Sequence, residues 1–137
     1  MRPLGPRDAD ELHRFHEFIH RTLRDDSALY RRDREFFEDV LRDAGRIVGV
    51  FAEDRLIAYA TICYRDVENS ALAPDLRRPL ADGTVVAQFE GAAVHPDFRG
   101  NRLHYRMGGW RMVEARRGAS RHVLVVVSPA SPYSLRS

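Results

Sequence analysis

The sequence predicts a mixed α/β fold, in which antiparallel strands are followed by one parallel crossover. Residues 47–52 and 56–64 are two β-rich runs separated by three polar residues, which is typical of an antiparallel hairpin. Residues 84–94, 101–117 and 122–127 then read as strand, helix and strand. A right-handed βαβ unit makes such strands parallel neighbours. The expected order of elements is therefore β-α-α-β-β-β-α-β.

The N-terminal part is predicted to form a short strand over residues 2–4 and two helices. Asp8 is expected at the N-cap of the first helix, with Glu11 at the capping-box position three residues later. Apolar residues then recur at helical spacing from Leu12 to Leu23. The second helix is predicted over residues 34–43, with Phe36, Phe37, Val40 and Leu41 facing inward. Gly45 is expected to end it.

The C-terminal part contains a long polar loop and the crossover. Residues 65–83 are predicted to be a surface loop, because they are polar and include two prolines. The helix over residues 101–117 is expected to bury Leu103, Met107, Trp110 and Val113, with Gly118 as its stop. The Val-rich strand after it is predicted to be central.

Composition narrows the class of protein. The chain has 137 residues, of which 44% are hydrophobic and 31% charged, and its net charge is +2. This balance predicts one globular domain over residues 1–137. All 22 basic residues are arginine and alternate with acidic ones, so we expect a solvated surface and no nucleic-acid patch. The longest apolar run, residues 123–127, is short of the ~20 residues of a membrane span. A single cysteine fits a cytoplasmic location.

The most informative stretch follows the strand over residues 84–94. It reads Ala-Val-His-Pro-Asp-Phe-Arg-Gly-Asn over residues 93–101, and a helix follows directly. A strand that enters a helix through a glycine-bearing turn directs backbone N–H groups outward at the positive end of the helix dipole. The sequence therefore predicts an anion site at this turn.

Residues 93–101 also resemble the acetyl-CoA motif of the GNAT superfamily of N-acetyltransferases. The opening residues 2–12, the hairpin end at 56–60 and the tail at 127–136 resemble other parts of that family. The resemblance implies the GNAT-type acyl-CoA N-acyltransferase fold, with the C-terminal strands missing. It also implies transfer of an acetyl group from acetyl-CoA to a primary amine of a small molecule or peptide, with no metal.

The resemblance assigns roles to residues around the turn. Glu90 is the expected general base, acting through water, and the Val94 N–H is the expected oxyanion donor. The pantetheine arm is expected to pair with the backbone of residues 92–94. The residues expected to bind acetyl-CoA are Ala92, Ala93, Val94, Arg99, Gly100, Asn101, Arg102, Leu103, His104 and Ser131.

The chain departs from the family pattern at two places. Arg102 and His104 stand where the family has small residues, and Arg102 is expected to adopt ordinary helix-start angles. The family's tyrosine general acid falls just after Ser137, and Tyr133 lies earlier than that position. We expect either a truncated chain or a homodimer through the exposed edge of the last strand. These departures keep open a non-catalytic GNAT-like domain that binds acyl-CoA or a protein partner.

The candidate residues also have ordinary structural explanations. Glu90 is predicted to share a face with Gln88 and Ala92. A structural role and a catalytic role for Glu90 are expected equally. His95 is expected to sit at the turn, Ser131 to serve equally well as an N-cap, and Cys63 to belong to the core. Four loop acids are expected to be solvated or to contact an amine: Asp66, Glu68, Asp75 and Asp82.

A literal H-E-x-x-H motif, from His16 to His20, raises a remote alternative, a zinc metallopeptidase. His13 lies on the same side of the predicted helix. Phe15 and Ile19 occupy the predicted buried face, so the histidines are expected to flank that face toward solvent. A third protein ligand is required, and nothing positions Glu35 or Glu38 for this role.

Overall fold

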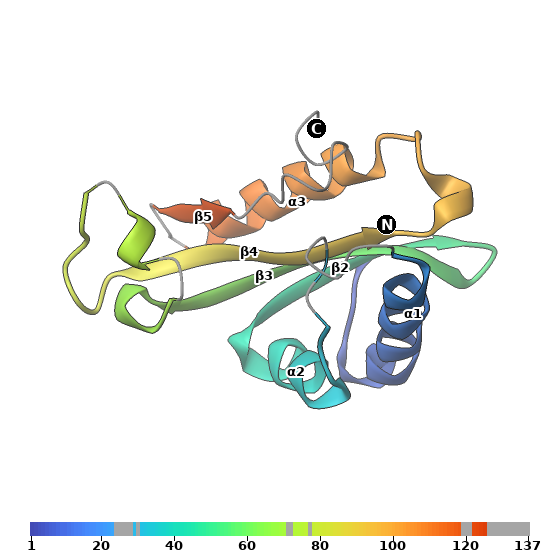
Figure 1. Ribbon diagram of the computed structural model, residues 1–137, viewed down its shortest axis with the longest axis horizontal. Coiled ribbons are helices and arrows are strands. Elements are labelled where there is room, and N and C mark those ends of the chain that lie inside the picture. Colours follow the sequence, from blue (N-terminus) through green and yellow to red (C-terminus); the bar gives the residue numbers. More distant parts are fainter. Residues whose placement is uncertain (24–28, 30, 71–72, 77, 119–121, 126–137) are drawn as a thin grey trace.

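The structure, a computed structural model, describes residues 1–23, 29, 31–70, 73–76, 78–118 and 122–125. It contains one five-stranded sheet in the order β1-β2-β3-β4-β5 (Figure 1). The strands are β1 (Arg2–Pro3), β2 (Gly45–Ala52), β3 (Arg55–Asp66), β4 (Val85–Val94) and β5 (Val123–Val125). Neighbours are antiparallel except for β4 and β5, which are parallel. The predicted mixed sheet, hairpin and βαβ unit are therefore confirmed.

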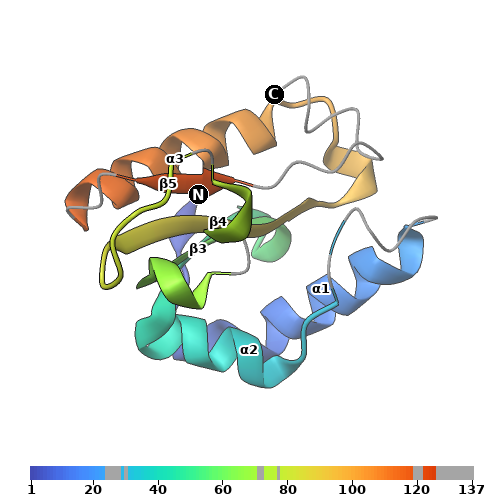
Figure 2. The same ribbon diagram turned by 60° about the vertical axis from the view of Figure 1, so that its left-hand side comes forward.

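Helices cover both faces of the sheet (Figures 1 and 2). One face carries α1 (Ala9–Thr22) and α2 (Arg34–Asp39), which continues into the π-helical turn η3 (Val40–Ala44). The other face carries α3 (Leu103–Arg117). The connections include short 3₁₀ turns: η1 (Pro6–Asp8), η4 (Val67–Asn69), η5 (Ala73–Asp75) and η6 (Pro96–Phe98). The predicted helices are confirmed to within a few residues at their ends.

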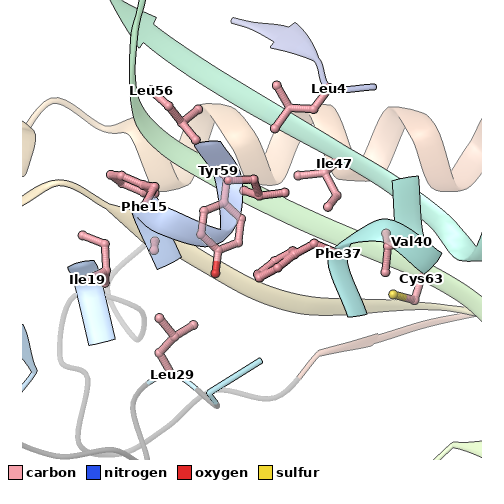
Figure 3. Packing of buried hydrophobic residues seen from close by; sticks show 12 residues of the cluster. Leu4, Phe15, Ile19, Leu29, Phe37, Val40, Ile47, Leu56, Tyr59 and Cys63 are labelled. Atoms are coloured by element: carbon pink, nitrogen blue, oxygen red, sulfur yellow. The ribbon is translucent and has the colours of Figure 1, made fainter. Parts of the chain in front are cut away.

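The core under α1 and α2 is built around Tyr59 of β3. Its ring is 1% exposed and lies edge-on to Phe15 and Phe37, with ring centroids 6.0 and 5.8 Å away. Figure 3 shows the Tyr59 hydroxyl directed toward Leu29, a residue of the segment between the two helices. Phe37 and Val40 are buried, and Phe36 and Leu41 pack partly buried against them, as the helical spacing predicts.

The buried face of α3 differs from the prediction. Leu103 and Met107 are buried and Trp110 is partly buried, but Val113 is 49% exposed. Glu114 and Ala115 face the sheet in its place. The Glu114 carboxylate lies 3.4 Å from Arg117 and 3.7 Å from Arg46. A charged residue can therefore occupy the inward position, which hydrophobic periodicity alone does not indicate.

The predicted capping box at the start of α1 is wrong. Asp8 occupies the N-cap position, but its carboxylate accepts from the Gly5 N–H at 2.8 Å and pairs with Arg2 at 3.1 Å. Glu11 accepts instead from the Leu56 N–H of the hairpin at 3.1 Å. Both carboxylates thus connect α1 to neighbouring segments. Neither of them caps the N–H groups at the start of α1.

The last predicted strand is described only in part. β5 covers Val123–Val125, and Ser131 and Tyr133 lie outside the described residues. Among the described residues β5 stands last in the sheet order, so the expected central position is wrong. Pairing through its edge in a homodimer stays a prediction. Among the described residues, every helix is too short or too polar to cross a membrane.

Candidate functional site

A β-bulge interrupts β4 at Glu90 and Gly91. Ala60 of β3 pairs with Ala92 and Ile62 pairs with Phe89, so Thr61 alone faces both residues of the bulge. A Cβ added at Gly91 would lie 3.1 Å from Leu29 Cδ1 and 3.7 Å from the Tyr59 hydroxyl. Glycine at this position lets the buried side chains approach the strand closely.

The bulge corrects the predicted face of Ala92. Gln88 Nε2 donates to Glu90 Oε1 at 3.0 Å, so these two side chains do share the face toward α1 and α2. Ala92 instead packs beside Met107 under α3. The rule that every second residue shares a face fails here because one extra residue lies between them.

The same bulge sets the direction of the backbone groups of β4. The His95 N–H donates to Ile57 of β3 at 2.7 Å, and N–H groups alternate between the two edges of an antiparallel strand. Ala92 and Val94 therefore direct their N–H groups away from β3, and Ala93 directs its own toward β3. Within the described residues, β5 pairs with β4 only up to Phe89. The described sheet thus leaves the outer edge at Ala92 and Val94 unpaired.

The turn between β4 and α3 contains two residues with left-handed backbone. Gly100 has φ of 87°, and Arg102 has φ of 58° and ψ of 27°. The expectation of ordinary angles at Arg102 is wrong. A left-handed residue followed by the right-handed helix brings successive N–H groups, here those of residues 102–104, around a concavity that suits an anion.

This concavity lies at the N-terminus of α3, and we call it the α3 nest (backbone N–H groups of Arg102, Leu103 and His104). The helix ladder begins with the Arg106 N–H donating to Arg102 O at 3.0 Å. In the described part of the chain, no side chain caps this helix end. Asn101 Nδ2 donates to Phe98 O at 2.9 Å and fixes the turn. The helix end therefore offers uncommitted donors to an anion.

The side chains around the nest are basic. Burial lowers the pKa of His104, and the positive charges of Arg111 and Arg99 lower it further. His104 is consequently neutral near pH 7 and leaves the charge to the arginines. The position that the family pattern gives to a small residue is thus occupied by an uncharged, half-buried ring.

Arg111 of α3 reaches the bulge, which the sequence did not predict. Its Nη1 donates to Glu90 O at 3.2 Å and Thr61 O at 3.3 Å, and its guanidinium lies 4.3 Å from the Phe89 ring centroid. Burial lowers its pKa to about 10, so the group stays charged at pH 7. These carbonyls flank the irregular pair of the ladder, and Arg111 provides them with a buried donor.

A polar cluster surrounds the Glu90 carboxylate on the face toward α1 and α2. Arg65 Nη2 lies 2.8 Å from Oε1, and Arg32 Nη2 lies 3.2 Å from Oε2. Gln88, which bonds Oε1, in turn accepts from Ser70 Oγ at 2.8 Å. We call these five residues the Glu90 cluster. Both carboxylate oxygens are therefore occupied, and a general-base role requires a partner to be displaced.

The histidines of the H-E-x-x-H motif do not form a metal site. His16 is completely buried, contrary to the expected orientation toward solvent. Its Nδ1 lies 2.8 Å from the Tyr59 hydroxyl, and its Nε2 accepts from the Arg32 N–H at 2.9 Å. Burial lowers its pKa to about 4. Both ring nitrogens are engaged, which contradicts the zinc metallopeptidase alternative.

Three of the remaining candidates have structural roles, whereas Asp66 and Asp82 are exposed loop acids. His95 accepts from the Asp97 N–H at 3.1 Å and stacks on Phe18 at 5.1 Å, so it belongs to the turn. Cys63 is 2% exposed, and burial raises its pKa to about 11. Glu68 accepts from the Gly83 N–H at 2.9 Å and closes the loop.

No protein-family model matches the chain, and no curated protein matches it in sequence. Solved structures do match. Arabidopsis thaliana NAA60 in complex with acetyl-CoA is 17% identical, with a TM-score of 0.72 over 98% of this chain and 78% of that one. A predicted acetyltransferase with acetyl-CoA from Clostridium acetobutylicum is 17% identical, with a TM-score of 0.72 over 98% and 84%. Aminoglycoside N-acetyltransferase AAC(6')-Iy with CoA is 16% identical, with a TM-score of 0.71 over 98% and 80%. The chain therefore has the fold of the GNAT N-acetyltransferases.

Proposed function

We propose that this protein is an N-acetyltransferase that moves an acetyl group from acetyl-CoA to a primary amine. The observation that carries this proposal is the bulge in β4, because it turns the N–H groups of Ala92 and Val94 to an edge that no described strand pairs. The α3 nest follows directly along the chain. The structures similar to this chain include complexes with CoA or acetyl-CoA, which supports the same co-substrate here.

The residues fit the parts of acetyl-CoA by their chemistry. The α3 nest offers converging N–H groups at the positive end of a helix, which suits a diphosphate. The unpaired edge of β4 offers N–H and C=O groups to the amides of the pantetheine arm. Arg99 and Arg102 are exposed and add positive charge beside the nest. Ser131, outside the described residues, stays a proposed contact.

Acetyl transfer needs few groups from the protein. The acceptor nitrogen forms a bond to the thioester carbon, the bond from that carbon to sulfur breaks, and the nitrogen loses a proton. The Val94 N–H donates to the thioester oxygen as negative charge develops there. Glu90 takes the proton through water once one of its oxygens is released from an arginine. The sulfur leaves as the CoA thiolate, which takes up a proton from solvent.

Calorimetry followed by a thiol-release assay tests this function. We expect acetyl-CoA and CoA to bind with heat that titrates to one site, and CoA thiol to appear when an accepted amine is added. Absence of binding at millimolar ligand would contradict every role that we propose for acetyl-CoA. Binding without thiol release across a broad amine panel would contradict catalysis.

A non-catalytic acyl-CoA-binding domain is the second candidate. One observation favours it, namely the occupation of both Glu90 oxygens by Arg32, Arg65 and Gln88. A carboxylate held in this way can serve only to fix the segment before α2 against the sheet. In that case acetyl-CoA would bind with the same affinity to the wild type and to the Glu90→Gln variant, and neither would release thiol.

A further inference from the structure

We propose that the acceptor amine also carries a carboxylate or phosphate group, and that Arg32 and Arg65 of the Glu90 cluster bind this group. The inference rests on the proposed acetyltransferase function and names its substrate class. Among the described residues, three guanidinium groups contact Glu90, two through its carboxylate and Arg111 through its carbonyl. The Glu90 carboxylate carries one negative charge and cannot neutralise both Arg65 and Arg111. An excess of positive charge therefore remains, whatever other contacts Arg32 makes.

The distribution of exposure shows which charge a ligand meets. The Glu90 side chain is 8% exposed, whereas those of Arg32 and Arg65 are 37% and 32% exposed. A molecule that approaches from solvent therefore contacts the guanidinium groups first, with the carboxylate beneath them. Guanidinium groups bind carboxylates and phosphates through paired, charge-assisted hydrogen bonds. The surface is suited to an anionic group and unsuited to a second ammonium.

Neighbouring charges on the N-terminal side of the cluster are already compensated. Arg31 pairs with Glu17 of α1 at 2.9 Å. The imidazole of His16 is held neutral by burial and accepts from the Arg32 backbone N–H. Among the described residues, the excess of positive charge thus lies at Arg65 and Arg111 beside Glu90. A polycationic acceptor such as an aminoglycoside would place like charges against this positive charge. The expected acceptor therefore differs from the aminoglycoside named for AAC(6')-Iy.

The same arrangement links acceptor binding to the proton transfer. An anionic group that binds Arg32 withdraws Nη2 from Glu90 Oε2, and this oxygen then accepts a proton from the attacking amine through water. The surrounding positive charge also favours the neutral, nucleophilic form of the amine over its ammonium form. An acceptor without the anionic group leaves Glu90 held by both arginines.

Matched acceptors test the proposal. The full chain is assayed with acetyl-CoA and with β-alanine against β-alaninamide, phosphoethanolamine against ethanolamine, and the aminoglycoside kanamycin. We expect kcat/KM to be about tenfold or more higher for the anionic member of at least one pair, as one charge-assisted contact predicts. The first pair reports a carboxylate and the second a phosphate.

Substitutions assign the preference to the cluster. Arg32→Gln is expected to reduce the preference to about threefold or less by raising KM for the anionic member, and Arg32→Lys is expected to keep part of it. Arg31→Gln is the matched control and is expected to keep the full preference, because Arg31 pairs with Glu17. Thermal unfolding of each variant confirms that it is folded.

Each result separates the acceptor class from the acetyltransferase function. If β-alaninamide and ethanolamine, which have no anionic group, are turned over as well as or better than their anionic partners, or if kanamycin is, the anionic acceptor is overturned. The acetyltransferase function is then left standing. A preference that survives in Arg32→Gln overturns the role of Arg32. Absence of thiol release with every amine overturns the acetyltransferase function and the inference with it.

Discussion

At the bulge of β4, the two sides of the sheet present different kinds of chemical group. Toward α3, the candidate groups are backbone N–H donors on the edge of β4 and in the α3 nest. Toward α1 and α2, they are charged side chains brought together from distant segments, with Glu90 58 residues from Arg32 and 25 from Arg65. Backbone donors do not depend on side-chain identity, so the first side is suited to the proposed constant co-substrate, acetyl-CoA. Side chains can be replaced by substitution, so the second side is suited to an acceptor that differs between proteins.

The largest expected effect tests the side made of side chains. Glu90→Gln is expected to lower kcat by about 10²- to 10⁴-fold, the usual contribution of a general base. The affinity for acetyl-CoA is expected to stay unchanged, because the side chain faces α1 and α2. Thiol-release kinetics and calorimetry measure the two quantities. Glu17→Gln is the control, since this carboxylate also pairs with an arginine but lies on α1. A kcat similar to that of the control would exclude Glu90 as the base.

The next prediction concerns Arg111, which is the link between the two sides. Arg111→Met removes the donor of two carbonyls at the bulge and is expected to destabilise the fold by about 3 kcal/mol. Arg106→Met, an exposed arginine on the same helix, is the matched control. Denaturation by urea measures both. Equal stability of the two variants would show that the bulge does not depend on Arg111.

The two sides also differ in how far the sequence reveals them. The turn before α3 is local, so its residues can be identified from a continuous motif, as can the strands and helices from their periodicity. The Glu90 cluster cannot, because its members belong to separate segments without a common spacing. The bulge is hidden for a related reason. Alternation in Gln88, Glu90 and Ala92 looks regular in the sequence, and only pairing with β3 shows the extra residue.

Two wrong expectations have a common physical cause. Hydrophobic patterning directs His16 toward solvent and Val113 toward the core, on the assumption that polar residues lie outside and apolar ones inside. His16 is buried because Tyr59 and the Arg32 backbone use both ring nitrogens. Val113 is exposed because Glu114, paired with arginines, takes the inward position. Satisfied hydrogen bonds and ion pairs can override hydrophobicity at individual positions.

The pH dependence of stability tests the side toward α1 and α2 in a different way. His16 has a pKa of about 4 in the folded protein, below the ordinary histidine value of 6.5. The unfolded state therefore binds more protons between these values, and stability falls as the pH drops from 6.5 toward 4. Between pH 7 and pH 5 the loss is expected to be about 2 kcal/mol by urea denaturation.

A variant isolates the contribution of His16. His16→Gln is expected to be less stable than wild type at pH 7, because a buried ring is lost, but its stability is expected to change less between pH 7 and pH 5. Arg14→Gln, an exposed residue of the same helix, is the control and is expected to keep the wild-type slope. A slope unchanged by His16→Gln would assign the acid sensitivity to other groups.

The smallest expected effect tests whether backbone alone forms the site toward α3. Arg102 has left-handed backbone, which costs a residue with a side chain about 1–2 kcal/mol. Glycine avoids this cost but gains freedom in the unfolded chain, so Arg102→Gly is expected to stabilise the fold by less than about 1 kcal/mol. Asp54→Gly, also left-handed but in the β2–β3 hairpin, is the control for relief of strain.

If the N–H groups of the α3 nest hold the diphosphate, Arg102→Gly changes the affinity for CoA by less than about fivefold, since an exposed charge contributes little. A much larger loss in calorimetry, absent from Asp54→Gly, would transfer the binding from the backbone to the Arg102 side chain and remove the contrast between the two sides.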